Sequence, residues 1–184
     1  MKTMSMPEIS DTKPSRKIIL PRWMAFVLGF FAWFIAIPLV HCGLPWAISL
    51  LTPRYGWTEG KPGVWNFFGL IAVGFAIVWL IWIMVLGMAQ TPKKVELEWN
   101  SSFLLMRGPY AHTRNPMYVA ELGLWLGWAI FYGSVLILIG FTVLCGVINF
   151  IVLPREERAL EERFGEVYRQ YKRKVPRWLG KTQR

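Results

Sequence analysis

The chain has 184 residues, of which 54% are hydrophobic and 16% aromatic, while only 17% are charged. An average soluble domain carries about 25% charged residues, and a small soluble domain this apolar would expose large apolar patches and aggregate. The same composition excludes a disordered chain. The formal net charge is +10, from 21 Lys and Arg against 11 Asp and Glu, so the positions of the charges decide the class of protein.

Three long runs contain no Asp, Glu, Lys or Arg: residues 23–53, 62–92 and 122–154. Each is longer than the about 20 apolar residues that a helix needs to cross a bilayer. The apolar stretch 70–80 does not alternate with polar residues, as a strand of a membrane β-barrel would. We therefore predict an all-α, multi-pass integral membrane protein.

We expect four membrane-spanning helices, over residues 23–44, 64–88, 116–131 and 134–153. The last two form a hairpin with a tight turn, and they are short at 1.5 Å per residue, so tilting or thinning of the bilayer is expected. The first helix either continues through a kink at its prolines or divides at Pro38 or Pro45, which would give five segments.

Basic residues are distributed unevenly over the predicted loops. Nineteen of the 21 Lys and Arg lie on the side that holds both termini and the loop 89–115, and two, Arg54 and Lys61, lie on the other side. The positive-inside rule places both termini and this loop in the cytoplasm, at a plasma or inner membrane. Attraction to anionic lipid headgroups explains the basic charge better than nucleic acid binding does.

The third span has a distinct start. Asn115 suits the N-cap position and Pro116 the first helical position. Such a start leaves backbone N–H groups and a partial positive charge at the cytoplasmic surface, with Arg114 directly before it. This pattern predicts a site for an anionic group such as a carboxylate or phosphate. Alternatively, the helix is simply capped and Arg114 reaches toward the headgroups.

Glu121 lies about 7–8 Å beyond this helix start, at 1.5 Å per residue. An ionisable residue at that depth faces the bundle interior by default and is a functional candidate. The alternative is a carboxylate at headgroup level that pairs with Arg114 or Arg107. Cys42 and Cys145 lie at or within apolar runs and lack metal-ligand spacing, so we predict no metal site.

After the last span, apolar side chains recur every three or four residues, which predicts an amphipathic C-terminal helix that ends at Pro176. The recurring residues are Leu160, Phe164, Val167 or Tyr168, Tyr171 and Val175. This helix would lie on the membrane or pack against the loop 89–115. Glu156 and Glu157 lie at the membrane exit, where an acidic pair is unusual.

Two blocks of residues carry a family resemblance. The first is Gly108-Pro109-Tyr110 followed by Arg114-Asn115-Pro116-Met117-Tyr118, and after a hydrophobic hairpin the second is Glu156-Glu157, Leu160, Phe164-Gly165, Tyr168, Tyr171 and Val175-Pro176-Arg177. In order and spacing, residues 85–180 resemble the isoprenylcysteine carboxyl methyltransferase family and its relatives, the phospholipid methyltransferases.

The resemblance implies a membrane-embedded methyltransferase that uses S-adenosylmethionine. Its acceptor would be lipophilic and enter from the bilayer: an isoprenylcysteine-like carboxylate, or another lipid-like carboxyl, amine or thiol. We expect no nucleic acid and no obligate protein partner. The chain would be a single membrane domain, 1–184, with a cytoplasmic segment 1–22, a transmembrane pair 23–88, a cofactor-binding core 89–178 and a tail 179–184.

The resemblance also assigns the cofactor site to the loop before the third span, the start of that span and the helix after the membrane. The implicated residues are Gln90, Leu104, Leu105, Gly108, Tyr110, His112, Arg114, Asn115, Pro116, Met117, Tyr118, Glu156 and Glu157. Glu156 would take the cofactor's amine, while the helix start and Arg114 would take its carboxylate. Arg114, Glu121 and Glu156 are the candidate catalytic residues.

The acceptor's headgroup remains open. A carboxylate acceptor needs no general base, whereas an amine or thiol would need one, for which Glu121 and His112 are candidates. The eukaryotic enzymes have an Arg four residues before the glutamate that matches Glu156, and this chain has Val152 there. Two alternatives are an NADPH-dependent membrane sterol or enone reductase, which has a similar Arg-His/Asn-Pro-x-Tyr block, and a non-catalytic lipid-binding membrane protein. The Glu156-Glu157 pair followed by Leu160 favours the methyltransferase.

Overall fold

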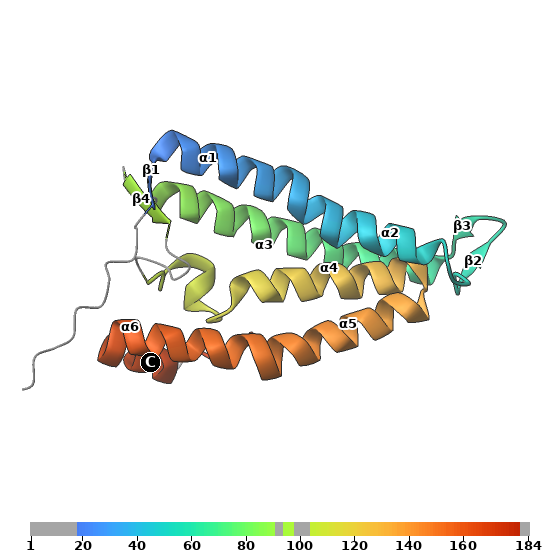
Figure 1. Cartoon of the computed structure of the whole chain (residues 1–184). Coiled ribbons are helices and arrows are strands. Elements are labelled where there is room, and N and C mark those ends of the chain that lie inside the picture. Colours follow the sequence, from blue (N-terminus) through green and yellow to red (C-terminus); the bar gives the residue numbers. More distant parts are fainter. Residues whose placement is uncertain (1–17, 91–93, 98–103, 181–184) are drawn as a thin grey trace, which may run out of the picture.

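The computed structural model describes residues 18–90, 94–97 and 104–180. Its long helices run side by side and alternate in direction, so that the molecule is an elongated all-α bundle (Figure 1). Within these described residues, three helices are long and apolar enough to cross a membrane: Val27–Ser49, Val64–Ala89 and Val135–Lys174. The third predicted span is α4 (Pro116–Tyr132), a shorter helix of 17 residues in the same bundle. The prediction of an all-α membrane protein is therefore confirmed.

The first span is one continuous helix, so the division into five segments is wrong. It consists of α1 (Arg22–Phe31), two π-helical turns (Ala32–Ala36 and Leu39–Gly43) and α2 (Leu44–Ser49). A proline in a helix collides with the carbonyl group four residues before it. For Pro38 and Pro45 that carbonyl belongs to Phe34 and His41, and each lies in one of the wider π-helical turns. The helix thus accommodates both prolines and extends to Ser49 rather than Leu44.

The second span is α3 (Phe68–Gln90), preceded by a 3-10 turn (Val64–Phe67), in agreement with the prediction. Small residues let α3 and α4 approach closely, as is common for helices in membranes. A Cβ on Gly127 would lie 2.7 Å from the carbonyl oxygen of Gly69, and Ala76 and Ala120 are completely buried between the helices. This contact fixes α4, and with it the start of the third span, against α3.

The hairpin between the third and fourth spans turns where predicted, because α4 ends at Tyr132 and α5 (Val135–Val147) follows directly. The fourth span then continues without a break through a π-helical turn (Ile148–Val152) into α6 (Leu153–Lys174). In that turn the Leu153 N–H donates to the carbonyl of Ile148, five residues back. This wider turn again contains the carbonyl group four residues before a proline, here Pro154.

The amphipathic C-terminal segment is not the single helix that its periodicity predicts. It turns sharply at Gly165 (φ 54°, ψ −125°), in a backbone conformation that favours glycine. The chain folds back beyond this point, and Lys172 Nζ lies 3.0 Å from Glu161 Oε2. As predicted, the helix ends shortly before Pro176.

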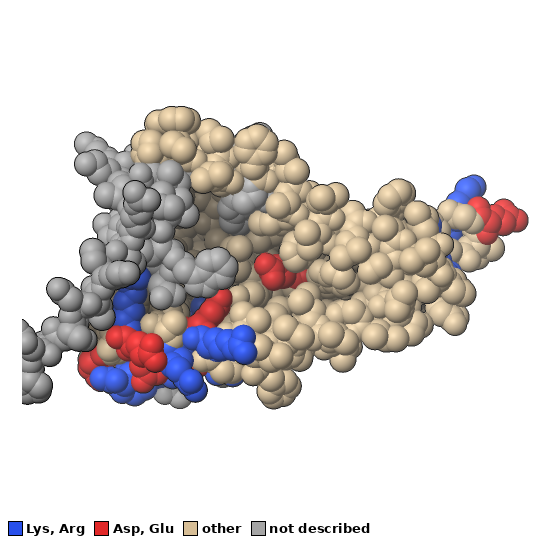
Figure 2. All heavy atoms as spheres, viewed as in Figure 1, with Lys and Arg blue, Asp and Glu red and all other residues tan. Residues whose placement is uncertain are grey.

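Two short antiparallel ribbons complete the described part of the chain. β1 (Ile18–Pro21) pairs with β4 (Lys94–Leu97), and β2 (Trp57–Thr58) pairs with β3 (Lys61–Pro62) at the opposite end of the bundle. Figure 2 shows charged side chains gathered around α6, a smaller group at the β2–β3 end, and an almost uncharged surface between them. This is the charge pattern of a helical bundle that spans a membrane.

Candidate functional site

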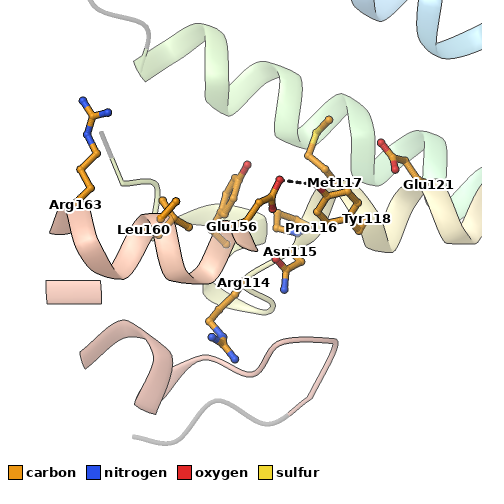
Figure 3. Close-up of a pocket in the computed structure, with 11 residues that line it drawn as sticks. Arg114, Asn115, Pro116, Met117, Tyr118, Glu121, Glu156, Leu160 and Arg163 are labelled. Atoms are coloured by element: carbon orange, nitrogen blue, oxygen red, sulfur yellow. Dashed lines mark hydrogen bonds between the residues drawn. The ribbon is translucent and has the colours of Figure 1, made fainter. Parts of the chain in front are cut away.

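A cavity of about 390 Å³ lies where the start of α4 meets the first half of α6 (Figure 3). Its wall is formed by Tyr110, Arg114, Asn115, Pro116, Met117, Tyr118, Glu121, Glu156, Ala159, Leu160 and Arg163. Small-molecule sites typically occupy about 300–1,000 Å³. The fold thus brings together the two sequence blocks, with eight residues that the sequence analysis singled out, although their roles stay predictions.

A hydrogen bond joins the two blocks across the cavity. Tyr118 Oη donates to Glu156 Oε1 over 2.7 Å, so the first turn of α4 is linked to the first turn of α6. Tyr110 lies on the same wall, and burial together with the negative charge of Glu156 raises the pKa of its phenol. Glu156 is exposed, so its second carboxylate oxygen is accessible to a ligand.

The helix α4 begins at the predicted residue, but the Asn115 side chain does not make the predicted capping contact. Asn115 occupies the N-cap position, yet its side chain does not cap the helix. Instead Asn115 Nδ2 donates to the carbonyl oxygen of Arg177 over 2.9 Å. Pro116 has no N–H, and the N–H groups of the first helical turn lack partners within the helix. This uncapped turn, with Met117 and Tyr118, forms part of the cavity wall.

Arg114 contributes to the wall, but its guanidinium group points away from Glu156 (Figure 3). Arg114 Nη1 lies 2.9 Å from Glu157 Oε1. Arg177 holds the same carboxylate with two hydrogen bonds, of 3.0 Å from Nε and 2.8 Å from Nη2. Glu157 is only 7% exposed, and its hydrogen bond raises the pKa of Arg177. The two guanidinium groups and Glu157 form an ion cluster in which Glu157 is buried, Arg114 is largely buried and Arg177 is partly exposed, and none of these contacts is directed toward the cavity.

Further contacts fasten the returning C-terminal segment to the loop before α4. Thr113 Oγ1 donates to the carbonyl oxygen of Arg177 (2.8 Å), and the Arg114 N–H donates to that of Pro176 (2.9 Å). Tyr171 Oη donates to the carbonyl oxygen of Tyr110 (2.6 Å). These hydrogen bonds position the loop. We call them, together with the Glu157 ion cluster, the C-terminal clasp.

Several predicted site residues lie outside the cavity wall. Leu104 packs against the apolar cluster of Tyr168, Tyr171 and Val175. Gly108 adjoins Leu86 and Trp82, and the His112 ring centroid lies 6.0 Å from that of Trp82. Leu105 and Glu157 are not on the wall either. Gln90 is the last residue of α3, and its side chain lies outside the described part of the chain.

Three residues of the cavity wall were not predicted as site residues, although Leu160 belongs to the second block of the resemblance: Ala159, Leu160 and Arg163. They follow Glu156 by three, four and seven residues, so they share its helix face. That spacing was available in the sequence and would have identified them. The role of Arg177 was not identifiable in this way, because its contacts join residues 20 and 62 positions apart.

Comparison with known proteins identifies the family of the chain. The chain matches the family described as phospholipid methyltransferase over residues 64–167, which is more than half of its length. An uncharacterized protein of Haemophilus influenzae is 43% identical over 63 residues, which cover 34% of this chain and 100% of that protein. No solved structure matches the chain significantly. The chain therefore belongs to the phospholipid methyltransferase family and is a membrane methyltransferase.

Proposed function

We propose that the protein transfers the methyl group of S-adenosylmethionine to a lipophilic acceptor that reaches the cavity from the bilayer. The observation that carries this proposal is the cavity itself. It combines the carboxylate of Glu156, the hydroxyl of Tyr118 and the uncapped start of α4 at the end of the membrane-spanning bundle.

The groups on the cavity wall suit this cofactor, which has an amine, a carboxylate, an adenosine and a sulfonium. Glu156 is an acceptor for the amine. The first turn of α4 offers backbone N–H groups and a partial positive charge for the carboxylate. The rings of Tyr110 and Tyr118 offer π faces to adenine or to the sulfonium cation. Because Glu157 holds Arg114, the helix start is the better candidate for the carboxylate.

When bound, the cofactor would supply a methyl group already activated by the sulfonium. The protein's task is then to align the two reactants and to exclude water. Tyr118 and Glu156 would fix the cofactor's end of the site, and Glu121, one helical turn further along α4, would face the acceptor. An amine or thiol acceptor would lose a proton, which Glu121 could accept. An acceptor carboxylate would need no such base.

We further propose that the cavity faces the cytoplasm of a plasma or inner membrane. A water-soluble cofactor requires an aqueous side, and the charges around α6 are where the positive-inside rule expects the cytoplasm. Both termini would then be cytoplasmic, and the neighbouring molecules would be membrane lipids. An accessibility assay on single cysteines introduced into the β2–β3 loop and into α6 tests this orientation.

Binding and transfer are tested on the purified full chain in detergent. S-adenosylmethionine should raise the melting temperature, whereas NADPH should not. With the cofactor's methyl group labelled and a membrane lipid extract as acceptor, label should enter the organic phase. Tyr118→Phe should reduce this transfer, and Tyr132→Phe at the far end of α4 should not. Stabilisation by NADPH alone would support a reductase, and the absence of both cofactor binding and transfer would contradict the proposal.

A further inference from the structure

A buried hydrogen bond reaches the candidate site from the second span. Trp79 of α3 is 9% exposed, and its indole Nε1–H donates to the carbonyl oxygen of Pro116 over 3.1 Å. The two helices that this bond joins, α3 and α4, run side by side (Figure 1). Pro116 belongs to the cavity wall, whereas Trp79 does not. Trp79 therefore acts on the candidate site through Pro116.

The acceptor of this bond is one half of a peptide group that also faces the cavity. The Pro116 carbonyl and the Met117 N–H belong to the same planar peptide and point in opposite directions. In an α-helix the N–H side is directed toward the helix start. Met117 lines the cavity, and its N–H is a first-turn donor for which the helix provides no carbonyl partner. The indole thus holds one side of this peptide and leaves the other side to a ligand.

The packing around Trp79 supports the same part of the site. Trp79 belongs to a buried cluster with Ala76 and Ala120, and the Met117 side chain packs against that cluster. The ring centroid of His112, in the loop before α4, lies 6.4 Å from that of Trp79. In this way α3 supports both the loop and the first turn of α4 from behind. A misplacement of about 1 Å in an active site can cost about a hundredfold in rate, so this support bears on function.

We propose that Trp79 is a positioning residue for the cofactor. Its indole N–H orients and polarises the Pro116–Met117 peptide, so that the Met117 N–H binds the cofactor's carboxylate. A hydrogen bond to the carbonyl strengthens the N–H of the same peptide as a donor, by about 10–30% for hydrogen bonds in a chain. This inference rests on the proposed function and adds to it a residue outside the cavity that sets the affinity for one group of the cofactor.

Two ligands that differ only in the carboxylate test the inference on the purified full chain. Decarboxylated S-adenosylmethionine keeps the amine, the adenosine and the sulfonium. The unmodified protein should bind S-adenosylmethionine about tenfold more tightly than this analogue, as expected for a hydrogen bond to a charged group. Trp79→Phe should lower that affinity ratio about threefold to tenfold, the change that corresponds to one hydrogen bond. Isothermal titration calorimetry measures both affinities.

Steady-state transfer gives a second reading of the same variant. In Trp79→Phe the KM for S-adenosylmethionine should rise by the same factor as the ratio falls, and kcat at saturating cofactor should change less than about twofold, because the lost interaction is made equally before and during transfer. If Trp79→Phe does not fold, Trp79→Met replaces it, since methionine fills irregular core space and also lacks the donor.

Trp125→Phe is the matched control. It removes another interhelical indole hydrogen bond of the same length, from Trp125 Nε1 to His41 Nδ1 (3.1 Å), at a residue that is 8% exposed and does not line the cavity. Both variants should lose similar thermal stability. The affinity ratio of the two ligands should change in Trp79→Phe and stay unchanged in Trp125→Phe.

The outcomes separate this inference from the proposed function. If the unmodified protein binds neither ligand and transfers no methyl group, both are overturned. If it binds the two ligands equally well and still transfers, the inference alone is overturned, because the carboxylate is then not recognised at the helix start. If Trp79→Phe weakens both ligands equally, or Trp125→Phe changes the ratio as much, Trp79 has a structural role only and the inference is again overturned.

Discussion

Glu156 and Glu157 are neighbours in the sequence, but they serve two different surfaces of α6. Consecutive residues of an α-helix point about 100° apart. Glu156 is exposed toward the cavity and accepts a hydrogen bond from Tyr118, whereas Glu157 is 7% exposed and lies between Arg114 and Arg177 in the C-terminal clasp. The identical side chain thus belongs to the candidate site at one position and to the scaffold at the next.

This difference in surroundings determines which of the two carboxylates can bind a ligand. A buried carboxylate requires compensation by opposite charges, and Glu157 obtains it from two guanidinium groups. Those groups are thereby directed away from the cavity. The Glu156 carboxylate is exposed and accepts a hydrogen bond from the neutral Tyr118, so a cationic ligand can approach it. The clasp and the cavity wall should therefore respond differently to the same substitution.

Glu157→Gln should have the largest effect on stability. It removes the carboxylate that the largely buried Arg114 and the partly exposed Arg177 share. Removing one partner of a buried ion pair typically costs about 3–5 kcal/mol, and the exposure of Arg177 places the expected cost at the lower end. For a chain of this size about 3 kcal/mol corresponds to a fall of roughly 6–12 °C in melting temperature. Thermal unfolding of the detergent-solubilised protein measures it. Glu162→Gln, on an exposed position of the same helix, is the control, and equal melting temperatures for both variants would contradict the assignment.

Glu156→Gln should instead leave the melting temperature of the ligand-free protein nearly unchanged and weaken S-adenosylmethionine binding. A hydrogen bond to a charged group contributes about 1.5–3 kcal/mol, which corresponds to roughly a tenfold to hundredfold loss of affinity. Isothermal titration calorimetry on the two glutamate variants gives the comparison directly. A variant that binds the cofactor as well as the unmodified protein would remove Glu156 from the proposed site.

Thr113→Val examines the clasp without changing a charge. Thr113 is completely buried, and its hydroxyl donates to the Arg177 carbonyl and accepts from the Asn115 N–H. The Asn115 N–H would lose its partner, while the Arg177 carbonyl would keep the hydrogen bond from Asn115 Nδ2, so the loss should cost about 1–3 kcal/mol. Thr142→Val is a matched control, because the exposed Thr142 hydroxyl donates to the Leu138 carbonyl of its own helix. A similar loss in both variants, measured by thermal unfolding, would show that the clasp adds nothing.

Features set by local chemistry could be predicted from the sequence. Long uncharged runs define the spans, and the Asn115-Pro116 pair places the start of α4 correctly. The π-helical turns could not be predicted, because a proline requires some relief but does not specify a wider turn instead of a break. The turn at Gly165 was hidden because apolar periodicity continues on both sides of it, and only the positive φ reveals it.

In the candidate site, too, the sequence identified blocks of residues but not the contacts between residues far apart in the chain. The family resemblance selected the two blocks, and the fold brings Tyr118 and Glu156 within one hydrogen bond. The sequence could not reveal that Arg114 pairs with Glu157, because proximity in the sequence placed Arg114 beside the helix start instead. Which of two adjacent glutamates faces the cavity depends on the rotation of α6, and that rotation is set by tertiary packing.

The smallest effect is expected at Glu166, an exposed carboxylate on the second half of α6. Hydrogen bonds from Arg169 (2.8 Å) and Arg173 (2.7 Å) lower the pKa of Glu166 to about 2. Since the folded state holds this pKa below its usual value, the interaction stabilises the fold above about pH 4.5 and is lost as the pH falls toward 2. Exposure to solvent keeps the contribution small.

The melting-temperature difference between the unmodified protein and Glu166→Gln should therefore be small and positive at pH 6 and vanish near pH 2. It should also shrink in 1 M salt, because exposed ion pairs are screened. The deficit of Glu157→Gln should persist in the same salt, because Glu157 is buried and its partner Arg114 is largely buried. If both deficits respond equally to salt, burial is not what separates the clasp from the exposed carboxylates of α6.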